Sequence, residues 1–521
     1  MVLTKVGQQA PVMDTKDDAT LRLVARRIGI VGAGPAGLAA AREFIEENLR
    51  ARDRADSNSS TDYTDSPHCL PFTSITVFER SNDVGGVWNY TPEARCHYNL
   101  PQDNAAHAIR QNYDERSPTT GGFPTPLYDN LHTNLPKDVM QFSDLAFHEH
   151  LPDFPDRHAV HKYIHAYADS KVLIHKELPE FSLRLNTEVV DAAYNTEQNQ
   201  WICQMRRLDM DAESNNETYA ETFDALLVCT GRVSHPYIPD VSGLEQLSSE
   251  LPGTRVIHSK EYRRASDFAD KYVLIVGGAS SGTDISRQLS YTARSVHMSV
   301  SDDRLVQKTD TSLTLSPELG AGCNPDNLPL RHPRIKAISA ENKQVVFTDG
   351  TAIPIPDVII YATGYLSVYP FIRNSIQPLF PASDTPQSLT DGHTVRDLYK
   401  YLLYIHNPLL SIFGVPSKVV PFPLFEYQAM FVAQVYQGNV RLPSLAKMES
   451  MWQEIIREKD PYVMGMKQVD YENELLAIVT SANSSATGDR SFRHSRLGRV
   501  SEQWIDRRKH TFELRKRYLG Y

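Results

Sequence analysis

Residues 28–37 read Ile-Gly-Ile-Val-Gly-Ala-Gly-Pro-Ala-Gly, and this stretch decides the fold. Its first residues are typical of a short buried parallel strand. Residues 36–48 predict a helix because they are rich in good helix formers. Gly32, Gly34 and Gly37 give the spacing G-x-G-x-x-G, in which the glycines permit a tight turn, close approach of a pyrophosphate and close packing of helix on strand. The stretch therefore predicts a dinucleotide-binding strand–turn–helix unit.

An acidic residue stands where the ribose of a bound dinucleotide is expected. Residues 75–79 read Ile-Thr-Val-Phe-Glu, which predicts a second buried strand ending in Glu79. A carboxylate in this place accepts hydrogen bonds from ribose hydroxyls and disfavours a 2′-phosphate, so the sequence favours FAD or NAD here. Residues 49–71 separate the helix from this strand. Because they are rich in Arg, Asp, Ser and Thr, we expect a flexible surface insertion.

A second glycine-rich turn follows another apolar run, residues 272–276. The turn reads Gly277-Gly278-Ala279-Ser280-Ser281-Gly282, with alanine in the place of the middle glycine. A helix is expected from Thr283 onward. The strand expected at residues 295–301 ends without an acidic residue, so this second site differs from the first.

Hydroxyl and basic groups stand near the end of that strand instead, namely Ser299, Ser301 and Arg304. Such a cluster suits a 2′-phosphate, so the sequence predicts NADP as the second nucleotide. The neighbours Asp302 and Asp303 keep a second interpretation open, in which Arg304 is a solvated surface side chain.

Two further apolar strands are expected to end in the same dipeptide. Residues 223–229 lead to Thr230-Gly231, and residues 358–362 lead to Thr363-Gly364. We therefore expect two turns of similar design, one closing each nucleotide-binding unit.

The composition excludes several other classes of protein. The net charge is −10, so we expect neither a nucleic-acid surface nor binding to an anionic membrane. None of the five cysteines is at C-x-x-C spacing, so no redox disulfide and no metal site is predicted, and free thiols favour a cytoplasmic location. Residues 401–416, the most apolar run, are too short to span a membrane, and residues 1–20 lack the apolar core of a signal peptide.

The motifs occur in an order that resembles the flavin-containing monooxygenases, and the resemblance covers about residues 27–438. The soluble fungal branch is most similar. The matching motifs are Gly32-Ala33-Gly34-Pro35-Ala36-Gly37, Glu79, Gly85-Gly86-Val87-Trp88, Thr133-Asn134, the turn at residues 277–282, and Ala362-Thr363-Gly364-Tyr365.

The motif that identifies this family, F-x-G-x-x-x-H-S-x-x-Y, is present only in its second half, His258-Ser259-Lys260-Glu261-Tyr262. The related Baeyer–Villiger enzymes resemble this chain but carry Trp in place of Tyr262. A Baeyer–Villiger ketone monooxygenase and a non-catalytic FAD-binding regulator stay open as alternatives. A disulfide oxidoreductase is disfavoured because it needs paired cysteines. His258 is expected to be a packing residue.

The resemblance and the paired Thr-Gly strands together predict an α/β protein with two Rossmann-like dinucleotide-binding domains, the NADPH domain inserted into the FAD domain. The predicted parts are a flexible N-terminal tail at residues 1–25, the FAD domain at 26–233 and 344–440, the NADPH domain at 234–343, and a C-terminal helical and loop extension at 441–521.

The resemblance also implies a role for each matched residue. Asn134 is implied as the catalytic residue, beside the reactive edge of the flavin. The FAD-binding residues are Gly32, Ala33, Gly34, Pro35, Ala36, Gly37 and Glu79 for the pyrophosphate and ribose, Gly86, Val87 and Trp88 for the isoalloxazine, and the backbone of Val189 for the adenine. The other cofactor-binding residues are Gly277, Ala279, Ser280, Ser281, Gly282 and Arg304 for NADPH, together with Thr133, Thr363 and Gly364.

The activity implied by the resemblance uses NADPH, FAD and dioxygen. A flavin hydroperoxide forms and passes an oxygen atom to a soft nucleophile, the sulfur or amine nitrogen of a small molecule. The partners expected are therefore that small-molecule substrate and O2, with no membrane span, and a homodimer is compatible with the sequence.

Overall fold

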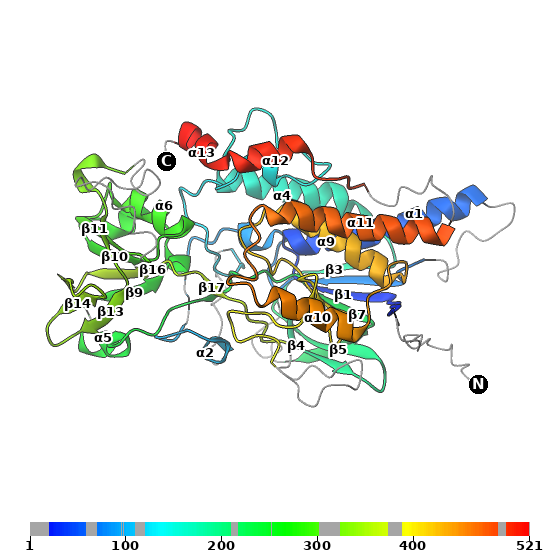
Figure 1. Ribbon diagram of the computed structural model, residues 1–521, viewed down its shortest axis with the longest axis horizontal. Coiled ribbons are helices and arrows are strands. Elements are labelled where there is room, and N and C mark those ends of the chain that lie inside the picture. Colours follow the sequence, from blue (N-terminus) through cyan, green and yellow to red (C-terminus); the bar gives the residue numbers. More distant parts are fainter. Residues whose placement is uncertain are drawn as a thin grey trace.

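The computed structural model describes residues 20–58, 70–94, 96, 98–109, 120–209, 217–251, 253–301, 323–372, 388–487 and 496–519. Within these ranges the chain forms two α/β units side by side, each built on its own sheet of mainly parallel strands (Figure 1). The two glycine turns therefore lie in separate sheets, and the predicted fold class is confirmed.

The first glycine turn follows β1 (Arg27–Val31), an inner strand of a seven-stranded sheet ordered β18-β19-β20-β7-β1-β2-β3. Val31 of this strand lies opposite Phe78 on one side and Val228 on the other, in parallel register. The apolar side chains of these strands are buried, as expected for a parallel sheet covered on both faces. The strands are β1 (Arg27–Val31), β2 (Ser74–Phe78), β3 (Phe181–Arg184), β7 (Ala225–Val228), β18 (Leu398–Tyr399), β19 (Leu403–Tyr404) and β20 (Leu410–Ile412).

Helices cover one face of this sheet and a small antiparallel sheet lies on the other (Figure 1). The helix α9 packs against both α1 and α11, and it is apolar on nearly all sides because it is enclosed. The helices are α1 (Pro35–Asn58), α4 (Arg157–Lys171), α9 (Pro421–Tyr436) and α11 (Lys467–Thr487), and the small sheet consists of β4 (Thr187–Asn195), β5 (Gln200–Arg207) and β6 (Thr218–Phe223).

The second glycine turn belongs to a five-stranded parallel sheet, ordered β12-β11-β10-β16-β9. Ile275 of the central strand lies opposite Met298 on one side and Ile360 on the other. The elements of this unit are β9 (Arg255–His258), β10 (Tyr272–Val276), α6 (Ser280–Leu289), β11 (Ser295–Ser299), β12 (Leu330–His332), β13 (Ile335–Ser339), β14 (Gln344–Phe347), β15 (Ala352–Pro354), β16 (Val358–Tyr361) and α5 (Leu244–Glu250).

The predicted return to the first unit at residue 344 is wrong. The strand β16 fills the gap between β10 and β9, and its apolar residues are buried there. Strand β14 belongs with it, because Val345 and Phe347 pack against Leu274 of the second sheet. The chain returns only at β17 (Tyr365–Leu366), which pairs with the outgoing strand β8 (His235–Pro236), so both connections between the units lie side by side.

The predicted surface insertion at residues 49–71 is wrong for its first part, which continues α1 to Asn58. Arg50 stabilises this extension by pairing with Glu46, at 2.8 Å, and with Glu47 on the same helix. Residues 59–69 lie outside the described ranges.

The predicted flexible tail at residues 1–25 is also wrong for its last residues, whereas residues 1–19 lie outside the described ranges. Leu21, Leu23 and Ala25 are buried. The backbone of Leu21 exchanges two hydrogen bonds of 2.8 Å with Leu442. The alternating apolar side chains explain this, since they give an extended segment one face for the core.

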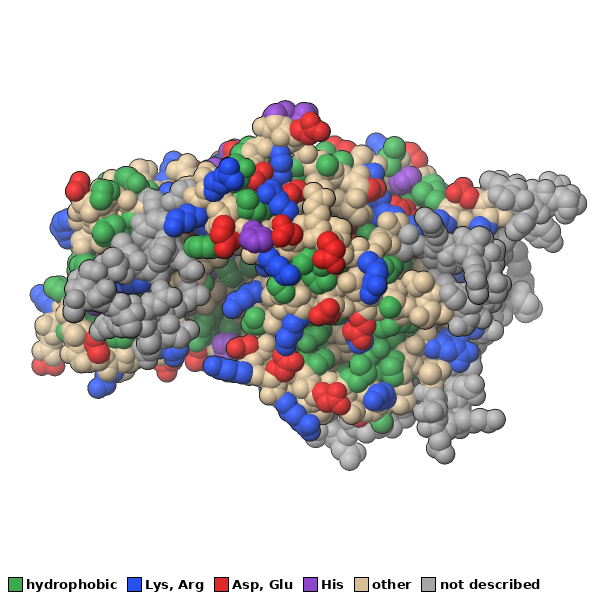
Figure 2. Space-filling view, turned by 45° about the horizontal axis from the view of Figure 1, so that its top comes forward, with side chains coloured by type: hydrophobic (Ala, Val, Ile, Leu, Met, Phe, Trp, Pro, Cys, Tyr) green, Lys and Arg blue, Asp and Glu red, His purple; other side chains and the backbone are tan. Residues whose placement is uncertain are grey.

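The C-terminal extension covers the first unit (Figure 1). The indole of Trp504 donates to the carbonyl of Val139, at 2.8 Å, and Arg507 pairs with Asp138 at 2.7 Å. No helix within the described residues is long and apolar enough to cross a bilayer. The remaining helices are α2 (Ala105–Ile109), α3 (Lys137–Met140), α10 (Leu445–Ile455), α12 (Glu502–Lys509) and α13 (Thr511–Leu519). Basic and acidic side chains are interspersed over the face seen in Figure 2.

Candidate functional site

The backbone of the first turn leaves no room for side chains at its outer glycines. Gly32 has φ +103°, and a Cβ there would lie 2.7 Å from the carbonyl oxygen of Cys229. A Cβ on Gly37 would lie 1.8 Å from the carbonyl oxygen of Gly32. The middle glycine, Gly34, faces a second loop, where a Cβ on Gly86 would lie 2.8 Å from the Cα of Gly34. Two bare backbones thus meet, and they leave an open cradle for a ligand.

The carboxylate of Glu79 fastens this turn. One of its oxygens accepts from the amide of Ala33 at 2.8 Å, and the other accepts from the amide of Ser81 at 2.9 Å. The residue is buried in the protein yet reaches the cavity wall. Each carboxylate oxygen keeps a further lone pair, so Glu79 can still accept from ligand hydroxyls.

The second turn repeats the backbone of the first. Gly277 has φ +112°, and a Cβ there would lie 2.4 Å from the carbonyl oxygen of Ala362. A Cβ on Gly282 would lie 2.0 Å from the carbonyl oxygen of Gly277. Ala279 caps the N-terminus of α6, whose first residues are Ser280 and Ser281. The helix begins with unpaired amides that can bind a phosphate.

A cavity of about 880 Å³ lies between the two turns. It brings together most of the predicted site residues from both units. Those on its wall are Gly32, Gly34, Pro35, Ala36, Glu79, Gly86, Val87, Trp88, Thr133, Asn134, Val189, Ser280 and Ser281. Others lie behind the wall and shape the turns, namely Ala33, Gly37, Gly277, Ala279, Gly282, Thr363 and Gly364. Arg304 lies outside the described residues.

The loop around Asn134 presents its amide to the cavity. The hydroxyl of Thr133 donates to the carbonyl of Leu135, at 2.9 Å, and so closes the turn. Asn134 is exposed, and within the part of the chain that the structure describes its side chain has no hydrogen-bond partner. The amide is therefore available to a ligand rather than used by the turn.

One wall of the cavity is aromatic and basic, and it was not predicted from the sequence. Arg232 lies there and donates to the carbonyl of Val415, at 3.1 Å. The other residues of this wall include Phe413, Lys418, Phe422 and Phe425. A signal was present, since residues 229–232 and 413–418 both follow the carboxyl ends of parallel strands, where ligands bind in open α/β sheets.

His258 is a packing residue, as the sequence indicated. It is completely buried, its Nδ1 accepts from the amide of Lys260 at 3.1 Å, and its Nε2 therefore donates to the carbonyl of Gly364 at 3.0 Å. Burial lowers the pKa of His258 to about 3, so the ring is neutral at physiological pH. It fixes the Thr363-Gly364 loop beside the second turn.

Comparison with known proteins extends these observations. The model of the family described as flavin-binding monooxygenase-like matches residues 117–310 and 330–481. The chain belongs to this family. A flavin-containing monooxygenase of Arabidopsis thaliana, FMO GS-OX-like 2, is 31% identical over 435 residues, which cover 81% of this chain and 76% of that protein. The thiol-specific monooxygenase of Saccharomyces cerevisiae is 29% identical, with 79% and 77% covered.

A solved structure of a related enzyme has the same fold as this chain. The S-allyl-L-cysteine S-oxygenase of Allium sativum superposes with a TM-score of 0.67 at 25% identity, and the match covers 95% of this chain and 94% of that one. The protein is thus a flavin-dependent monooxygenase that uses FAD and NADPH, with dioxygen and a small molecule as its reactants. The predictions of family, enzyme class and cofactors are confirmed.

Proposed function

We propose that FAD lies across the first turn and NADPH against the second, and that they meet in the cavity between them. The cradle of Gly34 and Gly86 supports the first assignment, because a pyrophosphate needs backbone without side chains. Glu79 accepts from the ribose of FAD, and the backbone of Val189 contacts its adenine. The amides at Ser280 and Ser281 bind the pyrophosphate of NADPH.

The two cofactors supply the redox chemistry: NADPH gives hydride, and FAD makes dioxygen reactive for transfer. The chain's own residues position the reactants and exclude water. The amide of Asn134 donates a hydrogen bond to the oxygen that is transferred, because it faces the cavity without an internal partner. The rings of Phe413, Phe422 and Phe425 keep water away from this oxygen.

We propose sulfur, rather than amine nitrogen, as the atom that receives the oxygen. The observation that carries this is the charge of the cavity wall. Among the described residues, each carboxylate on the wall is engaged: Glu79 by backbone amides, Glu188 by Arg206 and Asp284 by Arg287.

The cations of the aromatic wall are not neutralised in this way. Within the described residues, neither Arg232 nor Lys418 pairs with a carboxylate. A protonated amine entering the cavity meets positive charge and must also lose its hydration. A neutral sulfide is not repelled by these cations and has no ionic hydration shell to lose. A sulfide that carries a carboxylate gains an ion pair with them. The thiol-specific yeast enzyme and the Allium S-oxygenase support the same choice.

The test compares three substrates of one shape: benzyl methyl sulfide, N,N-dimethylbenzylamine and benzyl methyl ketone. Purified enzyme is given NADPH and air, and oxygenated product is measured by mass spectrometry. We expect kcat/KM for the sulfide to exceed that for the amine by at least about tenfold, equivalent to roughly 1.4 kcal/mol. The para-carboxy sulfide should be better still, and Lys418→Met should remove that gain. A preference for the amine would overturn the choice of sulfur, and ester formation from the ketone alone would favour Baeyer–Villiger chemistry.

We also propose a cytoplasmic location and a homodimer. Four cysteines in the described residues are free thiols, which suits a reducing compartment. Cell fractionation tests the first proposal, and light scattering of the purified protein tests the second.

A further inference from the structure

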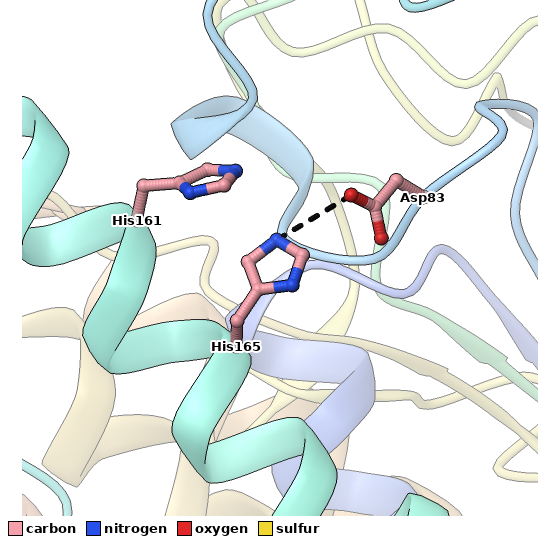
Figure 3. Close-up of side chains that lie close together, drawn as sticks. All are labelled: Asp83, His161 and His165. Carbon is pink, nitrogen blue, oxygen red and sulfur yellow. Dashed lines mark ion pairs between the residues drawn. The ribbon is translucent and has the colours of Figure 1, made fainter.

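Three potential metal ligands meet on the surface of the first unit, away from the cavity. His161 and His165 lie one turn apart on α4, so their side chains share one face of the helix. Asp83 comes from the loop that follows β2. Figure 3 shows both imidazoles projecting from α4 toward this loop. One ligand atom from each of the three residues lies within 4.8 Å of the other two.

The contacts inside this cluster are incomplete. The Nε2 atom of His165 is buried and has no hydrogen-bond partner. It lies 3.6 Å from a carboxylate oxygen of Asp83, which is too far for a hydrogen bond. Buried nitrogen atoms in proteins nearly always have a partner, so this one calls for an explanation. A cation between His165 and Asp83 would provide it.

We propose that Asp83, His161 and His165 bind a divalent transition-metal ion of the zinc class. Two imidazoles with one carboxylate are a ligand set typical of zinc, whereas calcium and magnesium take mainly oxygen ligands. Two atoms bound to one zinc ion lie at most about 4.2 Å apart, twice the roughly 2.1 Å bond length. The observed spacing needs only small side-chain rotations, which Asp83 can make because it is 52% exposed. Water or another small ligand completes the coordination.

The carboxylate of Asp83 is fixed by its own loop, because one of its oxygens accepts from the amide of Val84 at 2.8 Å and the other faces His165.

The loop that carries Asp83 also shapes the cradle of Gly34 and Gly86, where FAD lies according to the proposed function. Two residues after Asp83, the amide of Gly85 donates to the carbonyl of Ala33 in the first turn, at 3.0 Å. Gly86, the next residue, faces Gly34. A metal ion on Asp83 would tie this loop to α4 and thereby hold Gly86 against Gly34. The ion acts as a structural clamp, and it should slow the release of FAD without taking part in oxygen transfer.

The first measurement is zinc binding by the FAD-loaded enzyme, without an affinity tag, in isothermal titration calorimetry at pH 7.5. Wild type should bind one equivalent of Zn²⁺. Asp83→Asn and His165→Gln should each weaken binding by at least about tenfold, since each removes a ligand. His175→Gln is the matched control, because His175 lies beyond the end of α4 in the helix η3 (Leu173–His175) and outside the cluster. FAD content and circular dichroism verify that each variant is folded.

The second measurement is the rate of FAD release, followed by flavin fluorescence with and without Zn²⁺. Zinc should slow release several-fold in wild type and in His175→Gln, and it should have no effect in His165→Gln. Absence of zinc binding in wild type, or equal binding in folded Asp83→Asn and His165→Gln, would overturn the metal site. Zinc binding at the site with unchanged FAD release would overturn the clamp.

Discussion

The turn at residues 32–37 can be compared position by position with the turn at residues 277–282. The first amide of each turn donates to a neighbouring strand end, that of Gly32 to Phe78 at 2.7 Å and that of Gly277 to Ser299 at 2.9 Å. The outer glycines are crowded in both turns by equivalent carbonyl groups. The outer glycines are thus required by the fold itself, and their presence does not distinguish one nucleotide from another.

The difference lies in two positions. The middle residue is Gly34 in the first turn and Ala279 in the second. Because Phe78 and Ser299 are equivalent, Glu79 corresponds to Val300, which is buried and apolar. An acid at this position favours a plain ribose, and its absence leaves room for a 2′-phosphate. We therefore predict that these two positions distinguish the ligands of the two turns.

The largest expected effect comes from a methyl group at the crowded third glycine of either turn. Gly37→Ala and Gly282→Ala each force the backbone to shift at a cost of roughly 1–3 kcal/mol or more. Gly37→Ala should lose most of its FAD, measured as flavin absorbance per protein. Gly282→Ala should stay yellow and lose reduction by NADPH in stopped-flow experiments. Loss of flavin from both variants would show that the two turns do not serve separate nucleotides.

The second expected effect concerns Asn134, which lines the cavity. Removing one preorganised hydrogen-bond donor should slow oxygenation by roughly a hundredfold. Asn134→Ala should keep its FAD and still oxidise NADPH, but it should release hydrogen peroxide instead of oxygenated product. The measurement is product formed per NADPH consumed. An unchanged ratio would mean that Asn134 does not assist oxygen transfer and only stabilises its own loop.

Part of the fold and of the site could be predicted from the sequence alone. The crowded glycines, Glu79 and the paired Thr-Gly strands follow from local spacing, because each strand end and turn is a short-range pattern. The place of β16 does not, since its apolar residues fit either sheet and only pairing with β10 decides. Arg232 and Phe413 were missed for the same reason: segments 181 residues apart in the chain meet only in the folded protein.

The third prediction tests the absence of an acid at the second turn. Wild type should prefer NADPH over NADH by at least about tenfold in kcat/KM, equal to roughly 1.4 kcal/mol of interaction with the 2′-phosphate. Arg304→Ala should reduce this ratio if that residue binds the phosphate. A wild-type preference for NADH would contradict the nucleotide assignment. An unchanged ratio in the variant would exclude only Arg304 as a ligand of the 2′-phosphate.

The fourth prediction uses His258, which fixes the loop beside the second turn only. Burial lowers the pKa of His258 to about 3 in the folded protein. As pH falls, His258 is therefore protonated in the unfolded chain before it is protonated in the folded protein. Below about pH 6.5 the free energy of unfolding should therefore drop by up to about 1.4 kcal/mol per pH unit from this group. His258→Gln should flatten that slope, measured by urea unfolding between pH 6.5 and about pH 5. His175→Gln should keep it, and equal slopes in all three proteins would contradict this role.

The smallest expected effect is that of Ala279→Gly, which gives the second turn the middle residue of the first. Ala279 has φ −81° and ψ −170°, a conformation that alanine adopts without strain, so glycine relieves nothing there. The added backbone freedom should cost about 0.5–1 kcal/mol of stability, and KM for NADPH should change less than about threefold.

The reverse change in the first turn is the matched control. A Cβ on Gly34 would lie 3.5 Å from the Cα of Gly86, an ordinary contact, so Gly34→Ala should fold and should weaken FAD binding more than Ala279→Gly weakens NADPH binding. Fluorescence titration of each nucleotide measures both effects on one scale. Equal and small effects would mean that the residue at the middle position does not affect nucleotide affinity in either turn. A large loss of NADPH affinity in Ala279→Gly would instead mean that the methyl group itself contacts that nucleotide.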